Sequence, residues 1–168
     1  MEHIRYANMG TQSDCELVAN KCKNCSVEKC DFYFIYKLHD TASDLLGPIF
    51  PGDMKKNMRN KEVIIYDDPE PCAFCEFHVS KRRQYTAVYC ICTAESARRR
   101  GIALKFLQFL EEVYKLPIKA VCITNSASEA FWSKVAKKVG TKYSKKGTEL
   151  SIYIRNTITE YQQKEDLF

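Results

Sequence analysis

The sequence predicts an α/β fold in which a central mixed, mostly antiparallel and twisted sheet is flanked by helices. Three observations lead to this prediction. Three runs between residues 61 and 93 alternate apolar and polar side chains with a period of two, as antiparallel strands do. Two later runs have a helical period, and each is followed by another β-like run. With 168 residues, 45% of them hydrophobic, the chain is long enough for one domain with a buried core.

The first third of the chain predicts one strand and two helices. Residues 3–7 form a short β-like run. Residues 11–25 combine a capping pattern with an apolar face of helical spacing. Residues 26–47 are rich in aromatic side chains and predict a second helix, which a Gly-Pro pair closes. Residues 48–61 predict a polar, flexible loop.

The middle of the chain predicts three strands and the helix that follows them. The strands cover residues 61–68, 72–80 and 85–93, with turns between them. The helix begins close to Gly101 and ends before Pro117. Its apolar stripe is expected to consist of Ile102, Phe106, Leu107, Leu110, Val113 and Tyr114.

The last part predicts a strand over 118–124, a helix over roughly 127–139, and a hairpin that pairs 141–144 with 149–156. The helix is expected to stack Phe131, Val135 and Val139 on one side. We expect one domain over residues 1–156 and a flexible polar tail over residues 157–168.

Composition narrows the class of protein. The N-terminal residues do not resemble a secretion signal, and no apolar run approaches the roughly 20 residues that span a bilayer. We therefore expect a cytoplasmic protein with no membrane partner. The net charge of +5 permits an acidic or phosphorylated partner without requiring one. Nine cysteines, an odd number, are expected to be reduced thiols in that compartment.

The stretch between the strand 85–93 and the next helix predicts an anion site. The first N–H groups of a helix lack intrahelical partners and carry a partial positive charge. Here Gly101 lets a ligand approach the backbone closely, Ala103 is small, and three consecutive arginines add charge. Such an arrangement is typical of sites for phosphate or pyrophosphate.

This stretch, Arg98-x-x-Gly101-x-Ala103 after a β-strand, resembles the Arg/Gln-x-x-Gly-x-Gly/Ala signature of the GNAT superfamily of N-acetyltransferases. The element order from about residue 61 to 156 is similar to the GNAT fold. Residues 124–140 resemble the family's later motif, an asparagine after the fifth strand followed by a helix.

The resemblance implies acetyl-CoA as co-substrate. It places the pyrophosphate on the backbone of Arg98, Arg99, Arg100, Gly101, Ile102 and Ala103. It pairs the pantetheine arm with the end of the preceding strand, at Ile91, Cys92 and Thr93, where free N–H groups would polarise the thioester carbonyl. Asn125 matches the asparagine that reaches this arm.

Two positions depart from the family pattern. Many members have a tyrosine as general acid where this chain has Trp132, and an indole cannot supply a labile proton. Histone-type members have a glutamate base where this chain has Tyr85, with an alignment uncertain by one residue. The remaining candidates for proton transfer are Glu76 and His78 as bases and Tyr89 and Tyr143 as acids, each of which can equally be a structural residue.

The cysteines allow two interpretations. Two Cys-x-x-Cys pairs, Cys22 with Cys25 and Cys72 with Cys75, resemble half-sites for zinc. However, Cys72 and Cys75 lie three apart on a predicted strand, so their side chains point to opposite faces. We therefore expect buried thiols and no metal site.

Two further features suggest partners. The basic residues of 81–83 and of the C-terminal half have two interpretations. They form a solvated rim of the molecule, or they attract a nucleic acid. The terminal Asp166-Leu167-Phe168 resembles peptides that bind sliding clamps, and disorder is the alternative interpretation.

The sequence therefore predicts an acyl-CoA-dependent N-acetyltransferase that moves an acetyl group to a primary amine by direct attack in a ternary complex. The amine is a small molecule, a protein or a nucleic-acid base. The alternative is a GNAT-fold module that has lost catalysis and serves in binding or regulation.

Overall fold

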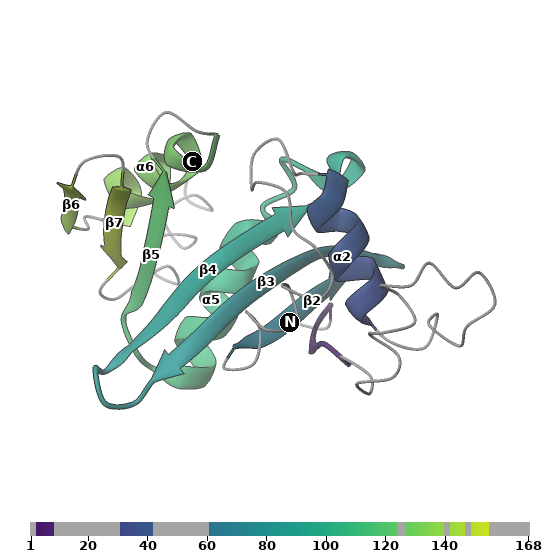
Figure 1. Ribbon diagram of the computed structural model, residues 1–168, viewed down its shortest axis with the longest axis horizontal. Helices are drawn as coiled ribbons and strands as arrows, with labels where there is room; N and C mark the ends of the chain where they lie inside the picture. The colour runs from purple at the N-terminus through teal and green to yellow at the C-terminus, as the bar shows by residue number, and fades with distance from the viewer. Residues whose placement is uncertain are drawn as a thin grey trace, which may run out of the picture. The chain divides into compact units, whose positions relative to one another are not determined.

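The computed structural model describes residues 3–8, 31–41, 61–123, 127–139, 142–146 and 149–154. Its strands hydrogen bond in the order β1-β2-β3-β4-β5-β7-β6 (Figure 1). Two compact units share this sheet. The first comprises Met1–Glu76 and Cys90–Ile102, and the second comprises Phe77–Tyr89 and Ala103–Phe168.

The first unit contains β1 (Ile4–Tyr6), α2 (Asp31–Thr41), β2 (Glu62–Asp67) and parts of β3 (Pro71–Ser80) and β4 (Tyr85–Thr93). β1 pairs antiparallel with β2, and Ile4 lies opposite Tyr66. Apolar residues of α2, β2, β3 and β4 are buried together with residues of the segment after β4: Ile35, Leu38, Val63, Ile64, Ile65, Tyr66, Ala73, Phe74, Cys75, Cys92, Ala97 and Ile102.

Arg5 joins three elements of the first unit. Its guanidinium donates two hydrogen bonds to Asp31, at 2.6 and 2.9 Å, and two to Asp67, at 2.6 and 3.3 Å. Burial alone would raise the pKa of Asp31, but the hydrogen bonds from Arg5 and from the Asn8 N–H lower it overall. The Asp31 N–H also donates to the Asn8 carbonyl at 2.7 Å. The start of α2 is thereby fixed to β1 and β2.

The second unit contains the hairpin end of β3 and β4, most of α5 (Ile102–Tyr114), β5 (Ile118–Ile123), α6 (Ala127–Val139), β6 (Lys142–Lys146) and β7 (Glu149–Ile154). β4 and β5 run parallel, with Thr86 opposite Ile118. β7 pairs antiparallel with both β5 and β6, so the hairpin places β7 inside the sheet and β6 at its edge.

Most elements agree with the sequence predictions, including the strand at 3–7, the three strands of 61–93 and the final hairpin. The second predicted helix is confirmed for 31–41, whereas the first, at 11–25, lies outside the described residues. A short 3-10 helix, η2 (Glu95–Ala97), was not predicted.

Two predicted apolar faces need correction. Val113 was expected in the buried stripe of α5, but its side chain is 47% exposed. In the last turn of α5 the packed residue is Tyr114, whose ring centroid lies 5.7 Å from that of Phe77. On α6, Phe131 is only half-buried, and the buried positions are Trp132, Val135 and Ala136. Trp132 takes the inner position because its ring is the larger apolar surface.

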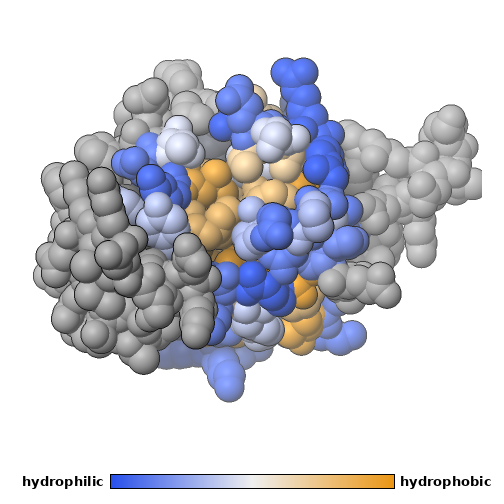
Figure 2. Space-filling model, turned by 90° about the vertical axis from the view of Figure 1, so that its right-hand side faces the viewer, coloured by the Kyte–Doolittle hydropathy of each residue, from blue (hydrophilic) through white to orange (hydrophobic). Residues whose placement is uncertain are grey.

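Figure 2 shows one side of the molecule, on which hydrophobic residues gather in an area bordered by hydrophilic residues. Charged side chains thus keep their contact with water, as in most folded domains.

Among the helices described here, none is both long and apolar enough to cross a membrane.

We expect the core of α5 to contribute strongly to stability. Phe106 is fully buried, so Phe106→Ala should lower the free energy of unfolding by about 3–5 kcal/mol. Val113→Ala on the exposed flank should change it by less than about 1 kcal/mol. Urea unfolding followed by circular dichroism measures both, and equal losses would contradict this placement of α5.

Candidate functional site

The connection between β4 and α5 turns the chain sharply within eight residues. β4 ends at Thr93, and the Ala94 N–H donates to the Cys72 carbonyl at 2.8 Å, which fixes the start of the turn to β3. Two residues then adopt left-handed backbone conformations, Arg99 at φ 63° and Gly101 at φ 73°. Glycine adopts this conformation freely, but for arginine it is strained.

The space beside Gly101 is open. A Cβ atom added at Gly101 would meet nothing within 4 Å. The next residue, Ile102, begins α5, whose first N–H groups have no intrahelical acceptor. Open space, a helix start and nearby arginines together suit a phosphate group.

The three arginines differ in what they contact. The Arg98 Nε donates to the Thr93 carbonyl at 3.3 Å, within the same turn. Arg100 forms an ion pair with Asp68, which follows β2. For the Arg99 side chain we find no ion pair or hydrogen bond within the described ranges. Two of the three arginines, Arg98 and Arg100, therefore hold the turn.

The end of β4 lies against α2. Cys92 is buried, and its Sγ donates to the Leu38 carbonyl of α2 at 3.7 Å. Burial raises the pKa of the Cys92 thiol to about 11, although Arg98 opposes the shift. The burial expected for the cysteine thiols is confirmed for Cys92. Its neighbours Ile91 and Thr93 are half-buried.

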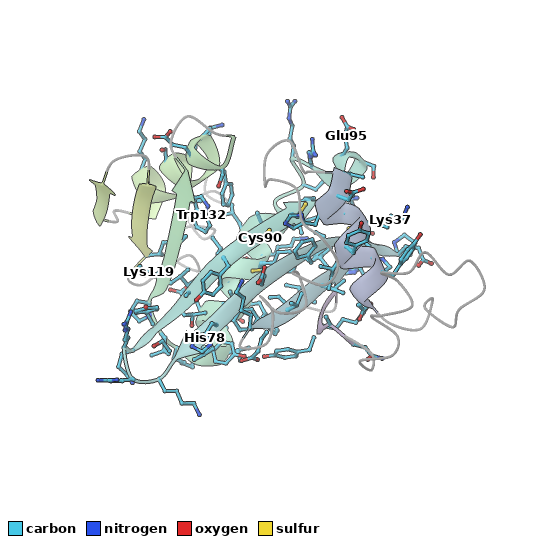
Figure 3. All side chains as sticks on the ribbon, viewed as in Figure 1. Lys37, His78, Cys90, Glu95, Lys119 and Trp132 are labelled. Atoms are coloured by element: carbon cyan, nitrogen blue, oxygen red, sulfur yellow. The ribbon has the colours of Figure 1, made fainter. Side chains whose placement is uncertain are left out.

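Ionisable side chains from several elements gather beneath α2. One of them is Glu76 on β3, whose Oε1 atom lies 2.5 Å from Nζ of Lys61. This contact is an ion pair and does not have the geometry of a hydrogen bond. Cys90 on β4, labelled in Figure 3, is close enough that the charge of Glu76 acts on its thiol. Burial and this charge raise the pKa of Cys90.

His39 on α2 belongs to the same cluster. Burial lowers the pKa of His39, and the negative charges of Glu76 and Asp40 partly oppose this. Its Nδ1 atom is buried and has no hydrogen-bond partner in the described part of the chain. Sequence reasoning missed His39, because no motif surrounds it. Its only signal was its place on an aromatic-rich helix in a chain with three histidines.

The other sequence candidates lie elsewhere or outside the described residues. His78, labelled in Figure 3, is half-buried on the part of β3 that belongs to the second unit. Tyr89 in that unit is 52% exposed. Asn125 and the side chain of Tyr143 are not among the described parts, so their expected roles stay predictions.

The two positions that depart from the family pattern have structural contacts in the second unit. Trp132 is 5% exposed and packs edge-on against Phe131, with ring centroids 5.0 Å apart. The Tyr85 ring lies under the Lys119 ammonium at 5.4 Å, and its hydroxyl accepts a hydrogen bond from Arg83 at 3.4 Å.

Four cysteines of β3 and β4 are free thiols: Cys72, Cys75, Cys90 and Cys92. Cys75 is fully buried, whereas Cys72 is half-buried and donates to the Tyr66 carbonyl at 3.5 Å. Among the residues that the structure describes, no three His, Cys, Asp or Glu side chains are placed to share a metal ion. Cys22 and Cys25 lie outside these residues.

Comparison with known families agrees with the geometry of the turn. The model of the "Acetyltransferase (GNAT) family" matches residues 28–136, more than half of the chain. The match includes α2, the cluster beneath it and the whole β4–α5 turn. No curated protein sequence matches the chain closely enough to count as a relative.

Solved structures with this fold include three bacterial acetyltransferases. An acetyltransferase from Thermus thermophilus aligns with a TM-score of 0.60 at 15% identity, over 91% of this chain and 96% of its own. The ribosomal-protein-S18-alanine N-acetyltransferase from Escherichia coli gives 0.58 at 13%, over 92% and 96%. A spermidine N-acetyltransferase variant from Vibrio cholerae gives 0.55 at 11%, over 80% and 94%. At such identities the likeness concerns the fold.

The burial of Cys92 predicts low reactivity. Because its pKa is about 11, the thiolate fraction at pH 8 is about 100-fold below that of an ordinary thiol of pKa 9. Alkylation by iodoacetamide, followed by peptide mass spectrometry, should therefore be slow at Cys92 and should accelerate about tenfold per pH unit. Fast alkylation at pH 8 would contradict the buried position.

Proposed function

Because the chain belongs to the acetyltransferase (GNAT) family, we propose that it transfers the acetyl group of acetyl-CoA to a primary amine. The observation that carries this proposal is the β4–α5 turn, with its open space at Gly101 and the arginines around it. The family match supports acetyl transfer in general, and the turn supports a nucleotide-bearing donor.

We assign the phosphate groups of the donor to the backbone of residues 98–103 and to the Arg99 side chain. The left-handed backbone at Arg99 and Gly101 supports this assignment, since such conformations orient successive N–H groups toward an anion. Arg98 and Arg100 position the turn through Thr93 and Asp68. On the resemblance alone, we assign the pantetheine arm to the backbone of Ile91, Cys92 and Thr93. Asn125 is assigned as a further contact of this arm on the same ground.

The donor supplies an activated thioester, so the chain has to bind, orient and deprotonate the amine. A covalent acetyl-cysteine at Cys92 is disfavoured because its thiol is buried and stays protonated at neutral pH. Direct attack by the amine in a ternary complex needs no such nucleophile. A thiolate is also a good leaving group, so activity is compatible with Trp132 at the position of the tyrosine acid.

The acceptor is proposed only as a class. The names of two structural neighbours include an alanine of a ribosomal protein and the polyamine spermidine, which both fit an amine acceptor. An amine on a nucleic-acid base remains an alternative, and so does a non-catalytic binding module, which Trp132 and Tyr85 favour. A cytoplasmic location and clamp binding through Asp166-Leu167-Phe168 also remain proposals.

Two substitutions at one position test the donor site. Gly101→Ala adds a Cβ in open space and costs about 1–2 kcal/mol of backbone strain, so the folded protein should still bind coenzyme A. Gly101→Glu has the same backbone cost and adds a negative charge, which should weaken binding roughly 100-fold. Isothermal titration with coenzyme A measures both. Equal affinities of the Ala and Glu variants would refute the site.

Turnover tests the activity itself. We expect the protein to release free coenzyme A from acetyl-CoA in the presence of spermidine, a peptide with an N-terminal alanine, a lysine peptide or adenine-containing single-stranded DNA. Mass spectrometry of the acceptor identifies the acetylated amine. Tight coenzyme binding without any turnover would favour the binding module instead.

A further inference from the structure

One face of β4 is open to solvent in the second unit. Two side chains in its first half, Thr86 and Val88, are buried. Their neighbours point to the other face, where Tyr85 and Ala87 are half-buried and Tyr89 is 52% exposed. β4 is an interior strand of the sheet, with β3 on one side and β5 on the other. An exposed aromatic ring on an interior strand belongs to a surface that another molecule can contact.

Tyr85 holds two cations on this face. Ala87 lies opposite Lys119 in the parallel pairing of β4 with β5, so the two side chains share one face of the sheet. The ammonium group of Lys119, which is labelled in Figure 3, lies 5.4 Å from the centroid of the Tyr85 ring. Arg83 donates a hydrogen bond from Nη1 to the Tyr85 hydroxyl at 3.4 Å. The ring and the hydroxyl of one tyrosine thus each bind a cation.

The strand segments that form this surface are basic. Residues 77–89 and 118–123 contain no aspartate or glutamate. They contribute four basic residues: Lys81, Arg82, Arg83 and Lys119. In the described parts of this unit, the acidic residues belong to α5, to α6 and to Glu149 of β7. Glu149 pairs with Ile123, at the other end of β5 from Lys119. The surface therefore attracts negative charge.

An acidic stretch of a protein or peptide complements this surface. The guanidinium of Arg83 and the ammonium of Lys119 each suit a carboxylate, and the exposed ring of Tyr89 offers apolar contact beside them. A polyamine is repelled by the same charges. A single-stranded nucleic acid fits less well, because its bases stack on aromatic rings and Lys119 already lies over the ring of Tyr85.

We propose that the acceptor is a peptide or protein with acidic residues near the acetylated amine, and that Lys119 and Arg83 select it. This inference rests on the proposed function, which assigns the pantetheine arm to the same strand. Tyr89 precedes Ile91, the first residue of that assignment, by two positions on β4. Lys119 and Arg83 act on recognition alone and take no part in bond formation.

Acetyl transfer to three peptides tests the selection. The peptides share an N-terminal alanine, and the residues after it are glutamates, serines or arginines. We expect kcat/KM to be highest for the glutamate peptide and lowest for the arginine peptide, at least about tenfold apart, mainly through KM. The difference should shrink at about 0.5 M salt. Equal kcat/KM for the glutamate and arginine peptides would overturn the inference and leave the proposed function standing.

Charge reversal assigns the selection to this surface. Lys119→Glu and Arg83→Glu should each lower kcat/KM for the glutamate peptide about tenfold and raise it for the arginine peptide. Lys119→Arg keeps the charge and should keep the preference. The control Lys137→Glu makes the same charge change at an exposed position of α6 and should also keep it. If Lys137→Glu changed the preference as much as Lys119→Glu, the assignment would be wrong.

A binding measurement is independent of turnover. The three peptides are acetylated at the alanine and labelled with a dye at the C-terminus, and fluorescence anisotropy measures their affinity for the full-length protein. The glutamate peptide should bind most tightly, and Lys119→Glu should remove its advantage. Stronger binding of single-stranded DNA than of the glutamate peptide would replace the acidic peptide by a nucleic acid. Preferred binding of the glutamate peptide without acetylation of any peptide would refute the proposed function instead.

Discussion

The turn from β4 into α5 is the constraint on which the rest of the site depends. Cys92 before the turn, Ala97 within it and Ile102 after it are all buried, so the chain must reverse while remaining packed at three points. Left-handed backbone at Arg99 and Gly101 makes this possible, and at the arginine it costs about 1–2 kcal/mol. The packed residues on either side hold the strained backbone in place.

The same turn explains why three adjacent arginines are not equivalent. Arg98 and Arg100 direct their hydrogen bonds to the carbonyl of Thr93 and to Asp68, and these contacts fix the turn to itself and to the end of β2. Arg99 differs from them in its left-handed backbone, and it is the arginine that we propose to bind the phosphate groups of the donor. On the α2 side of the first unit, the Leu38 carbonyl accepts the hydrogen bond of the Cys92 thiol at the end of β4.

Much of the fold could be predicted because its strands and helices differ in the period of their apolar residues. The strands of 61–93 and the helix after Gly101 follow from local sequence, and the anion site at the start of this helix stays a prediction. The position of β7 between β5 and β6 does not, since strand order depends on contacts between distant residues. For the same reason, the ion pair of Glu76 with Lys61 could not be predicted, because Lys61 lies on a separate segment. His39 could not be predicted either, because only its spatial neighbours distinguish it from other histidines. Val113 shows a further limit, because periodicity does not tell where a neighbouring surface ends.

The contacts of Arg5 with Asp31 and Asp67 have a consequence for how this chain can change. Asn8 and Asp31 bond directly, so the two ends of the 22 residues between them are held together by the scaffold itself. The start of α2 is thus anchored to β1 and β2 by contacts that do not depend on the sequence between Asn8 and Asp31.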